Sequence, residues 1–599
     1  MTPGRALPLA VGPILAALAV GAWTAAFRGY GVFDFADEGT LLAQALRTAH
    51  GQRPYLDFHT GYGPLYFALQ GALVAAGGLA AVRWALIVTH ALTAAAVWTV
   101  TQRLAGGAVA CAAIALEVAL FLPVAPDAGA PFLVPYPSWY AALLGVAVLL
   151  AVERRAGPVG VARAALAGVL AGVAFGVKAN SGLLIAGGAA AALVLGPTVT
   201  TAPGVLARVT LGLLGAGVIA IVMPPVTTVA WWVLVPPVLG LLLVVGRRAV
   251  PDVEAAPRLA ALVVGFAVVV GVTFGPSLAA LGPSRFLREV LLVGSGVADV
   301  YAVPFPRAAF AGVVAGVLAL RVPVDAAVGR LVGGAVVTVV LAAIEGALGG
   351  QGMAALRLGA EMAVLALVPL VAWAGIVMLR RAGDARAVAP VTLAVTAAVQ
   401  LYPRPDFLHL LAVAPVLLPL GLHVARTGAR GWLPRARATA VVVTVALVLA
   451  TVRVAPTLRV LALAPWTHVR VGDVTLGVTA GGADRLRALG AAVQAVRDHG
   501  DETVRVVTFP ACAVVPFFAG RLPAGPHDYF FPGRPDADEV AALARTFAAA
   551  PPPLAVTCDA AGTDLAVAWT QHGAMVSFLA ERYRPVAAMP PFHVLEAIP

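Results

Sequence analysis

An acidic pair, Asp37-Glu38, follows directly after the first long apolar run of the chain. The surrounding residues 28–63 hold too many Asp, His, Tyr and Gly residues to sit in lipid. A carboxylate beside low-dielectric surroundings has a raised pKa, and within hydrogen-bond reach of a hydroxyl it can act as a general base. The competing interpretation is a solvated loop whose acids merely avoid lipid, and charge alone favours it.

A lone lysine is the second candidate. Lys178 is the only lysine among the 40 lysine and arginine residues, and it lies where two apolar runs meet. A cation at such a depth is costly and usually faces a cavity or a partner. Lysine is a compact point charge and a common phosphate binder, which suits a lipid phosphate. The alternative is a lysine at a helix end whose charge reaches out to water.

A third polar cluster joins two late apolar runs, at residues 402–409. Its prolines stiffen the turn, and Arg404 could bind a phosphate or carboxylate through two parallel hydrogen bonds. The alternative is an ordinary positively charged turn capped by Asp406. Weaker candidates between other apolar runs are Arg285, Arg288, Glu289 and Asp127.

Several familiar catalytic signatures are missing from the sequence. It contains no Walker A loop, no His-Glu-x-x-His, no metal-spaced Cys/His set and no Gly-x-Ser-x-Gly elbow. This argues against an ATP-driven pump, a zinc protease and a serine hydrolase.

The candidate residues must be positioned by membrane-spanning helices. The 599-residue chain is 61% hydrophobic and 12% charged, whereas a soluble domain carries about 25% charged residues. Apolar runs long enough to cross a bilayer recur up to about residue 455. The net charge of +11 comes from arginines in short clusters between these runs, as in cytoplasmic loops, so we expect no nucleic acid partner.

The apolar runs and their basic flanks predict about 15 spans in the cell membrane. An uncleaved first span at 7–27 leaves the N-terminus in the cytoplasm and places 28–63 outside. The stretch 64–81 is interrupted by glycines, so we expect it to lie against the outer interface or to re-enter. The remaining spans are expected at 84–103, 106–124, 138–152, 161–178, 182–197, 205–224, 228–246, 259–281, 309–321, 331–350, 359–379, 388–401, 408–424 and 438–455.

The character of the chain changes at residue 466, where charges return. Short β-rich runs then alternate with helical segments, which predicts a small α/β domain over 466–599. The β-rich runs are 504–509 and 554–557, and the helical segments are 483–498 and 536–549. An odd number of spans places this domain outside the cell.

The three cysteines carry separate expectations. Cys512 and Cys558 lie in the C-terminal domain and could pair there if it is extracytoplasmic. Cys111 lies in an apolar run, where we expect it to be a small core residue.

Four motifs, in this order, resemble those of the GT-C glycosyltransferases, which are polytopic membrane enzymes. The narrower likeness is to relatives of protein mannosyltransferases, aminoarabinose transferases and lipopolysaccharide galacturonosyltransferases. The motifs are Asp37-Glu38 in the first outer loop, Gly51 to Phe58 with Pro64 to Tyr66, Phe-Gly-x-Lys-x-Asn at 175–180, and Tyr-Pro-Arg-x-Asp-x-x-His at 402–409. The likeness covers residues 7–455, and the segment Val515 to Arg521 resembles part of the outer α/β domain that often ends such chains.

The resemblance implies an all-α membrane domain over 1–465, followed by the extracytoplasmic α/β domain. It also implies sugar transfer from a polyprenyl-phosphate carrier to an envelope glycan, lipid or protein on the outer face, with inversion at the anomeric carbon. Asp37 would be the general base and Glu38 would orient it or the acceptor, although which of the two takes the proton stays open.

Further roles follow from the same resemblance. Lys178, Arg404 and His409 would stabilise the departing lipid phosphate. The residues expected to contact the substrates are Asp57, Tyr62, Tyr66, Asn180 and Asp406. Some members of the superfamily use a divalent metal and others do not. A second acidic motif of several relatives is represented here only by Asp127, so metal ligation stays open.

Two other classes of function compete with the enzyme. A transporter or flippase for lipid-linked cargo would show charges at mid-depth and paired broken helices in two halves. A scaffold would use its C-terminal domain to bind an envelope partner. The polar residues gather at one face and no halves repeat, which favours surface chemistry over a pathway through the membrane.

Overall fold

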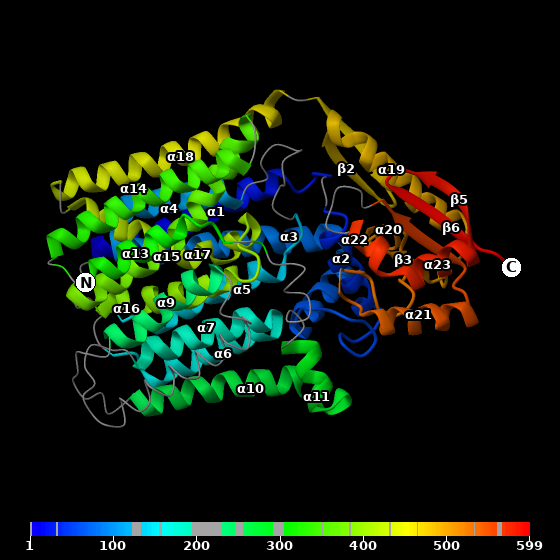
Figure 1. Ribbon diagram of the computed structural model, residues 1–599, viewed down its shortest axis with the longest axis horizontal. Helices are drawn as coiled ribbons and strands as arrows, with labels where there is room; N and C mark the ends of the chain where they lie inside the picture. Colours follow the sequence, from blue (N-terminus) through cyan, green and yellow to red (C-terminus); the bar gives the residue numbers. More distant parts are fainter. Residues whose placement is uncertain are drawn as a thin grey trace.

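The structure is a computed structural model with a helical bundle at one end and a smaller domain of helices and strands at the other (Figure 1). The N-terminus lies at the end of the bundle far from the smaller domain, and the C-terminus lies in that domain. The residues that the structure describes are 3–31, 34–121, 133–154, 158–194, 229–245, 255–291, 303, 305–320, 322, 324–349, 352–382, 385–430, 433–463, 465–531, 533–559 and 566–599.

The helices of the bundle follow the expected apolar runs closely. Their bounds are α1 Pro3–Ala26, α4 Gly107–Phe121, α5 Pro137–Val152, α6 Val161–Val177, α7 Ala179–Val194, α9 Val229–Val245, α10 Ala255–Leu281, α13 Ala309–Ala319, α14 Val324–Gly349, α15 Gly352–Ala382, α16 Val388–Ala398, α17 Phe407–Arg430 and α18 Arg435–Leu463. The span expected at 205–224 lies outside the described residues, as does Asp127.

By length and composition the described chain is a multi-pass membrane protein. Six of its helices are long and apolar enough to cross a bilayer, and several others are apolar but shorter. The six are Pro64–Ala105, Ala255–Leu281, Gly329–Leu348, Leu358–Arg380, Phe407–Ala429 and Arg435–Arg459. The expected total of about 15 spans is therefore not confirmed.

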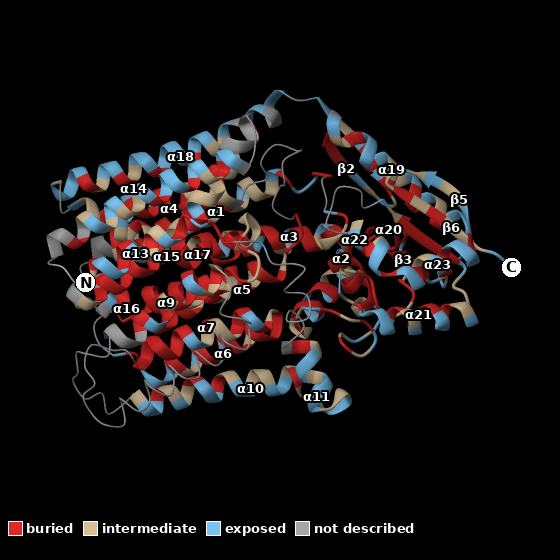
Figure 2. Cartoon of the chain, viewed as in Figure 1, coloured by how far each residue is buried: buried red, intermediate tan, exposed pale blue. Residues whose placement is uncertain are grey.

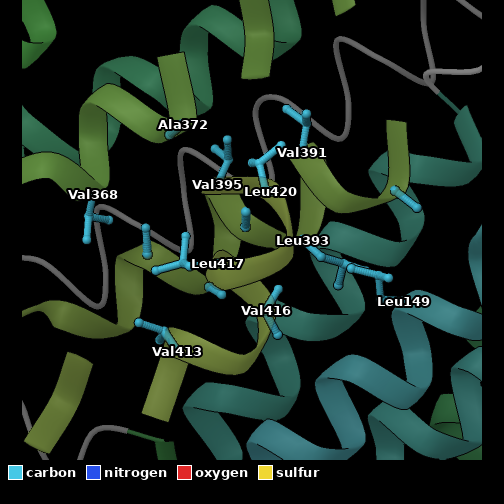
Figure 3. Packing of buried hydrophobic residues seen from close by; sticks show 14 of the residues in the cluster. Leu149, Val368, Ala372, Val391, Leu393, Val395, Val413, Val416, Leu417 and Leu420 are labelled. Carbon is cyan, nitrogen blue, oxygen red and sulfur yellow. The ribbon is translucent and has the colours of Figure 1, made fainter. Parts of the chain in front are cut away.

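Small and branched apolar side chains hold the bundle together. Buried residues concentrate where helices face one another, while α10, α14 and α18 expose many apolar residues, which suits contact with lipid (Figure 2). In the centre, side chains of α16 and α17 pack with Leu149 of α5 and Val368 of α15 (Figure 3). Glycine brings α6 and α10 close, since a Cβ on Gly168 would lie 2.0 Å from the Leu262 carbonyl oxygen.

The stretch 28–63 is not simply a loop, because it contains helix α2, Asp37–Ala49. Helix α3 follows at Pro64–Ala105, with a break in helical geometry at Gly77 and Gly78. This break lies within the stretch 64–81, which the sequence analysis separated from the next span. At 1.5 Å per residue the part before the break is about 20 Å long and the part after it about 40 Å, so only the second part is long enough to cross a hydrocarbon core of about 30 Å by itself.

The C-terminal domain confirms the expectation of alternating helices and strands. Its four-stranded sheet has the order β3-β4-β6-β5, in which β3 and β4 are parallel and the other pairs antiparallel. A separate hairpin, β1-β2, precedes it. The bounds are β1 Trp466–Val471, β2 Val474–Thr479, α19 Ala480–Asp498, β3 Val506–Phe509, α20 Val514–Ala519, α21 Ala537–Ala549, β4 Leu554–Cys558, α22 Ala566–Gln571, α23 Gly573–Arg582, β5 Tyr583–Met589 and β6 Phe592–Ala597.

The structure decides the pairing of Cys512 and Cys558, which the sequence left open, and corrects the expectation for Cys111. Cys512 and Cys558 form a disulfide that joins the start of α20 to the end of β4. The expectation that Cys111 is a core residue is wrong, because it is exposed on α4. An apolar helix in a membrane can turn a small side chain toward lipid as readily as toward the core, and composition alone does not distinguish these directions.

The C-terminal domain packs directly on α2. A Cβ on Gly39 would lie 2.7 Å from the Cβ of Val514, so α2 and α20 are in close contact. At the other end of α2, Arg47 forms an ion pair with Asp528 at 2.7 Å, and both side chains are fully buried. Helix α2 is therefore held by the C-terminal domain at both ends.

A second contact joins the same domain to the segments around α2. His59 stacks on His527 with ring centroids 4.3 Å apart. Its Nδ1 lies 3.1 Å from the carboxylate of Glu289. Glu289, one of the weaker candidates from the sequence, belongs to a short turn of helix, Leu287–Leu291, that follows α11 (Pro283–Phe286).

Candidate active site

Asp34 organises the N-terminus of α2. Its Oδ1 accepts hydrogen bonds from the backbone N–H groups of Ala36 and Asp37, both at 2.9 Å. Its backbone carbonyl accepts from the N–H of Glu38 at 3.0 Å. The free N–H groups of a first helical turn carry a partial positive charge that stabilises a carboxylate. Asp37 is thereby placed on the first turn of a short helix that faces the C-terminal domain.

The carboxyl of Glu38 connects two segments of the chain through hydrogen bonds to their backbone. Its Oε1 accepts hydrogen bonds from the backbone N–H groups of Leu133 at 2.6 Å and Val134 at 3.0 Å, and its Oε2 accepts from that of Asp34 at 2.7 Å. The side chain is only 2% exposed. Burial raises its pKa to about 8 although these backbone donors lower it. The carboxyl joins α2 to the segment before α5, and both of its oxygens are engaged.

Asp37 differs sharply from its neighbour. Its side chain is half-buried, and in the described part of the chain its carboxyl forms no hydrogen bond. Burial and the negative charges of Asp34 and Asp406 raise its pKa to about 7, against the opposing charge of Arg404. Near neutral pH this carboxyl is therefore divided between its protonated and its ionised form, as suits a general base.

The turn before α17 brings opposite charges together. Arg404 forms an ion pair with Asp406 at 2.8 Å, and the other oxygen of Asp406 accepts from the backbone N–H of His409 at 2.9 Å. The Nδ1 of His409 lies 2.8 Å from the same oxygen. Burial alone would raise the pKa of Asp406, but His409 and Arg404 hold it below its ordinary value. Asp406 thus caps the turn, as the interpretation of an ordinary charged turn predicts. The charges of Arg404 and Asp406 also act on the carboxyl of Asp37.

Lys178 lies at the junction of α6 and α7. Its Nζ donates to the Oγ of Ser138 at 2.6 Å and lies 5.9 Å from the ring centroid of Tyr136. It also interacts electrostatically with Asp406. Asp406 therefore interacts electrostatically with Lys178, Arg404 and Asp37, although these residues come from three separate parts of the sequence.

Backbone contacts fix the position of Lys178. The N–H of Gly63 donates to the carbonyl of Val177 at 2.9 Å. A Cβ on Gly63 would lie 2.0 Å from the carbonyl oxygen of Gly176, so only glycine fits there. The loop after α2 consequently rests directly on the end of α6, beside Lys178.

Two tyrosines that follow α2 in the chain, Tyr62 and Tyr66, line the same region. The hydroxyl of Tyr62 bonds to that of Tyr136, and the hydroxyl of Tyr66 donates to the carbonyl of Pro135 at 2.9 Å. Tyr66 is fully buried, so it supports the segment before α5, whereas Tyr62 is half-buried. Ser138 and Tyr136 escaped the sequence analysis, since a serine and a tyrosine at a span boundary are common; only their contact with the lone lysine distinguishes them.

Two residues expected to contact substrates have contacts elsewhere. Asp57 is exposed, and its carboxylate accepts from the backbone N–H of Arg53 at 2.7 Å. Asn180 is exposed and its side-chain oxygen accepts from the N–H of Ser181 at 2.8 Å. Among the described residues, neither side chain forms a hydrogen bond or ion pair with Asp37, Lys178 or Arg404.

The described residues do not assemble a metal site. Among them no three His, Cys, Asp or Glu side chains gather in a way that could hold an ion. The oxygens of Glu38 and Asp406 are already taken by backbone, arginine and histidine donors. We therefore derive no step through a metal.

Comparisons with known proteins give a limited result. No protein-family model matches the chain, and no curated protein sequence matches it. It is similar to the oligosaccharyltransferase of Archaeoglobus fulgidus, solved in complex with Zn and sulfate, at 15% identity and a TM-score of 0.42 over 92% of this chain and 67% of that chain. It is also similar to ArnT from Cupriavidus metallidurans bound to undecaprenyl phosphate, at 13% identity and a TM-score of 0.33 over 100% of this chain and 99% of that chain. Structural similarity at these values gives no information about the chemistry of this chain.

Proposed function

We propose that this protein is a membrane glycosyltransferase that moves a sugar from a polyprenyl-phosphate donor to a hydroxyl of an envelope glycan, lipid or protein. The observation that supports this proposal most strongly is the environment of the Asp37 carboxyl. It is half-buried, forms no hydrogen bond within the described chain, has a pKa of about 7, and lies within electrostatic reach of Arg404. A base and a cation placed together are what displacement of a lipid phosphate requires.

The reaction is a single displacement. The acceptor oxygen attacks the anomeric carbon of the donor sugar while Asp37 takes the proton of that hydroxyl. The bond between the anomeric carbon and the phosphate oxygen breaks, and its electron pair leaves with the lipid phosphate. Attack from the face opposite the leaving group inverts the anomeric carbon.

The cations act on the leaving group. Lys178 and Arg404 lie around Asp406, and their positive charges would stabilise the negative charge that develops on the departing phosphate. Ser138 holds the ammonium of Lys178 in place, and His409 holds Asp406. Glu38 acts indirectly, because it fixes the helix that carries Asp37.

The catalytic assignment is tested by composition of the cell envelope. Cells that lack this chain would be complemented with the wild type, with Asp37→Asn, or with Asp498→Asn as a control for loss of an exposed carboxylate on α19. Mass spectrometry of the envelope glycans should show the missing sugar restored by the wild type and the control but not by Asp37→Asn. Restoration by Asp37→Asn at normal expression would refute the assignment. A glycan that is the same in the uncomplemented cells and in the three complemented cultures would refute transfer to that glycan.

The proposed reaction takes place on the outer face, with the N-terminus in the cytoplasm and the C-terminal domain outside. The N-terminus and that domain lie at opposite ends of the bundle, which agrees with an odd number of crossings (Figure 1). Ala491 is exposed on α19, so Ala491→Cys should react with a membrane-impermeant maleimide in intact cells. Reaction only after the cells are opened would place the domain inside and remove the outer-face reaction.

A further inference from the structure

Arg485 presents a guanidinium group beside the N-terminus of α2. It lies on α19 of the C-terminal domain, with its central carbon 4.1 Å from the ring centroid of Phe35. Phe35 in turn packs on Phe592 of β6, with ring centroids 5.2 Å apart. A guanidinium over an aromatic ring is held in place while the edges of its plane stay open to a ligand.

No described residue accepts a hydrogen bond from the guanidinium of Arg485. In the described part of the chain it makes no hydrogen bond and no ion pair, and its charged interaction is an electrostatic one with Asp34. The other arginines of the same helix behave differently, since Arg487 pairs with Asp484 and Arg497 pairs with Asp473 at 2.8 Å. Arg485 therefore stands out as the exposed arginine of α19 with all five donors free.

Two backbone hydrogen bonds fix the position of α19, and so of Arg485, relative to the segment before α2. The N–H of Gly31 donates to the carbonyl of Gly477 at 2.8 Å, and the N–H of Gly477 donates to the carbonyl of Gly29 at 2.7 Å. The segment before α2 is thus bound to β2, the strand that leads directly into α19. Arg485 is consequently held near Asp34, whose side chain bonds to the backbone of Asp37.

We propose that Arg485 binds an anionic group of the acceptor, a phosphate or a carboxylate, and thereby selects acceptors that carry one. This rests on the proposed function, in which Asp37 receives the acceptor hydroxyl. The planar fork of a guanidinium matches both anions through two parallel hydrogen bonds. The cations of the bundle, Lys178 and Arg404, would then serve the donor phosphate, while the cation of the C-terminal domain serves the acceptor.

The test measures binding and does not depend on transfer. Protein in lipid nanodiscs would be titrated with octyl glucoside, octyl glucoside 6-phosphate and octyl glucuronide, which share a glycosyl group and differ in charge. The wild type should bind an anionic probe about tenfold more tightly than the neutral one. Arg485→Gln should lose this preference and Arg485→Lys should keep part of it. Arg487→Gln, which removes a charge from the same helix, should keep all of it.

The affinities of the three probes for the wild type and the variants decide between the possible outcomes. The anionic probe that loses more affinity in Arg485→Gln identifies the group as phosphate or carboxylate. Equal binding of the three probes to the wild type overturns the proposal, and so does an equal loss in Arg487→Gln, which would reduce the effect to general surface charge. Asp37→Asn should retain the anionic preference while losing transfer, so a failure of the proposed reaction and a failure of the acceptor site are seen in different measurements.

Discussion

Replacement of Asp37 by asparagine should abolish transfer and at the same time stabilise the protein at alkaline pH. Transfer should fall about 10²–10⁴-fold, the usual contribution of a general base. The stability effect follows from the pKa of this carboxyl, which the fold raises from 3.8 to about 7. In the unfolded chain the proton leaves near pH 4, whereas in the folded chain it leaves near pH 7.

Between these pH values the folded state binds more protons than the unfolded state, so stability falls as pH rises, and above pH 7 the loss is complete. At 1.36 kcal/mol per pH unit, a difference of about three units costs at most about 4 kcal/mol, and less because water reaches the half-buried carboxyl. Asparagine carries no charge and escapes this cost. Asp37→Asn should therefore have the higher thermal midpoint at pH 8, with a smaller gap at pH 5.

The neighbouring carboxyl supplies the contrast. Glu38→Ala would leave the backbone N–H groups of Asp34, Leu133 and Val134 without their acceptor, at a cost of roughly 1–3 kcal/mol for each group that stays buried. It should lower the thermal midpoint clearly at pH 5. At pH 8 the loss should be smaller, because the fold also raises the pKa of Glu38, to about 8, and alanine escapes the cost of ionising that buried carboxyl. Purified protein in detergent would be heated at pH 5 and pH 8 and assayed for transfer in parallel. A midpoint of Asp37→Asn below that of the wild type at pH 8, or transfer within tenfold of the wild type, would refute the reasoning.

Three further outcomes are expected. Initial rates of the wild type should rise with pH through about 7 and then level off, because only the ionised carboxyl of Asp37 accepts a proton; a rate independent of pH between 5.5 and about 8 would contradict this. Lys178→Met should lower kcat about 10²-fold at saturating donor, and Ser138→Ala should have a smaller effect of the same kind; a change confined to acceptor KM would remove Lys178 from the leaving group. Arg47→Ala should lower the free energy of unfolding by about 3–5 kcal/mol, because it leaves Asp528 buried without its partner. Hydrogen exchange should then increase at the contact between α2 and the C-terminal domain. Unchanged exchange there would show that the ion pair does not hold the two together.

The positions of the membrane helices were largely predictable. The expected spans at 138–152, 161–178 and 228–246 correspond to α5, α6 and α9 within a few residues. Lipid imposes this regularity, because an apolar run flanked by arginine has little choice but to form a helix across it. Helix α2 is harder to predict, because its polar composition favours a loop even though Leu42 and Leu46 lie at helical spacing.

The glycine contacts behind the site were beyond prediction. Gly63 resembles any loop glycine in the sequence, yet it allows the loop after α2 to touch the backbone at Gly176. Gly477 likewise joins the segment before α2 to β2, across more than four hundred residues of sequence. Contacts between backbones leave no signature in one sequence, because the residue that permits them is identified only by the absence of a side chain.

The sequence by itself determined which chemical groups are available and in what order, namely the acidic pair, the lone lysine and the arginine turn, each at the end of an apolar run. Only the tertiary structure decided how the two adjacent carboxyls differ. Glu38 turns inward to three backbone N–H groups, while the carboxyl of Asp37 is left without a hydrogen bond in the described chain. The physical reason is geometric: successive residues of a helix point about 100° apart, so one side chain of a pair faces the segment before α5 and the other faces the charges of the turn before α17.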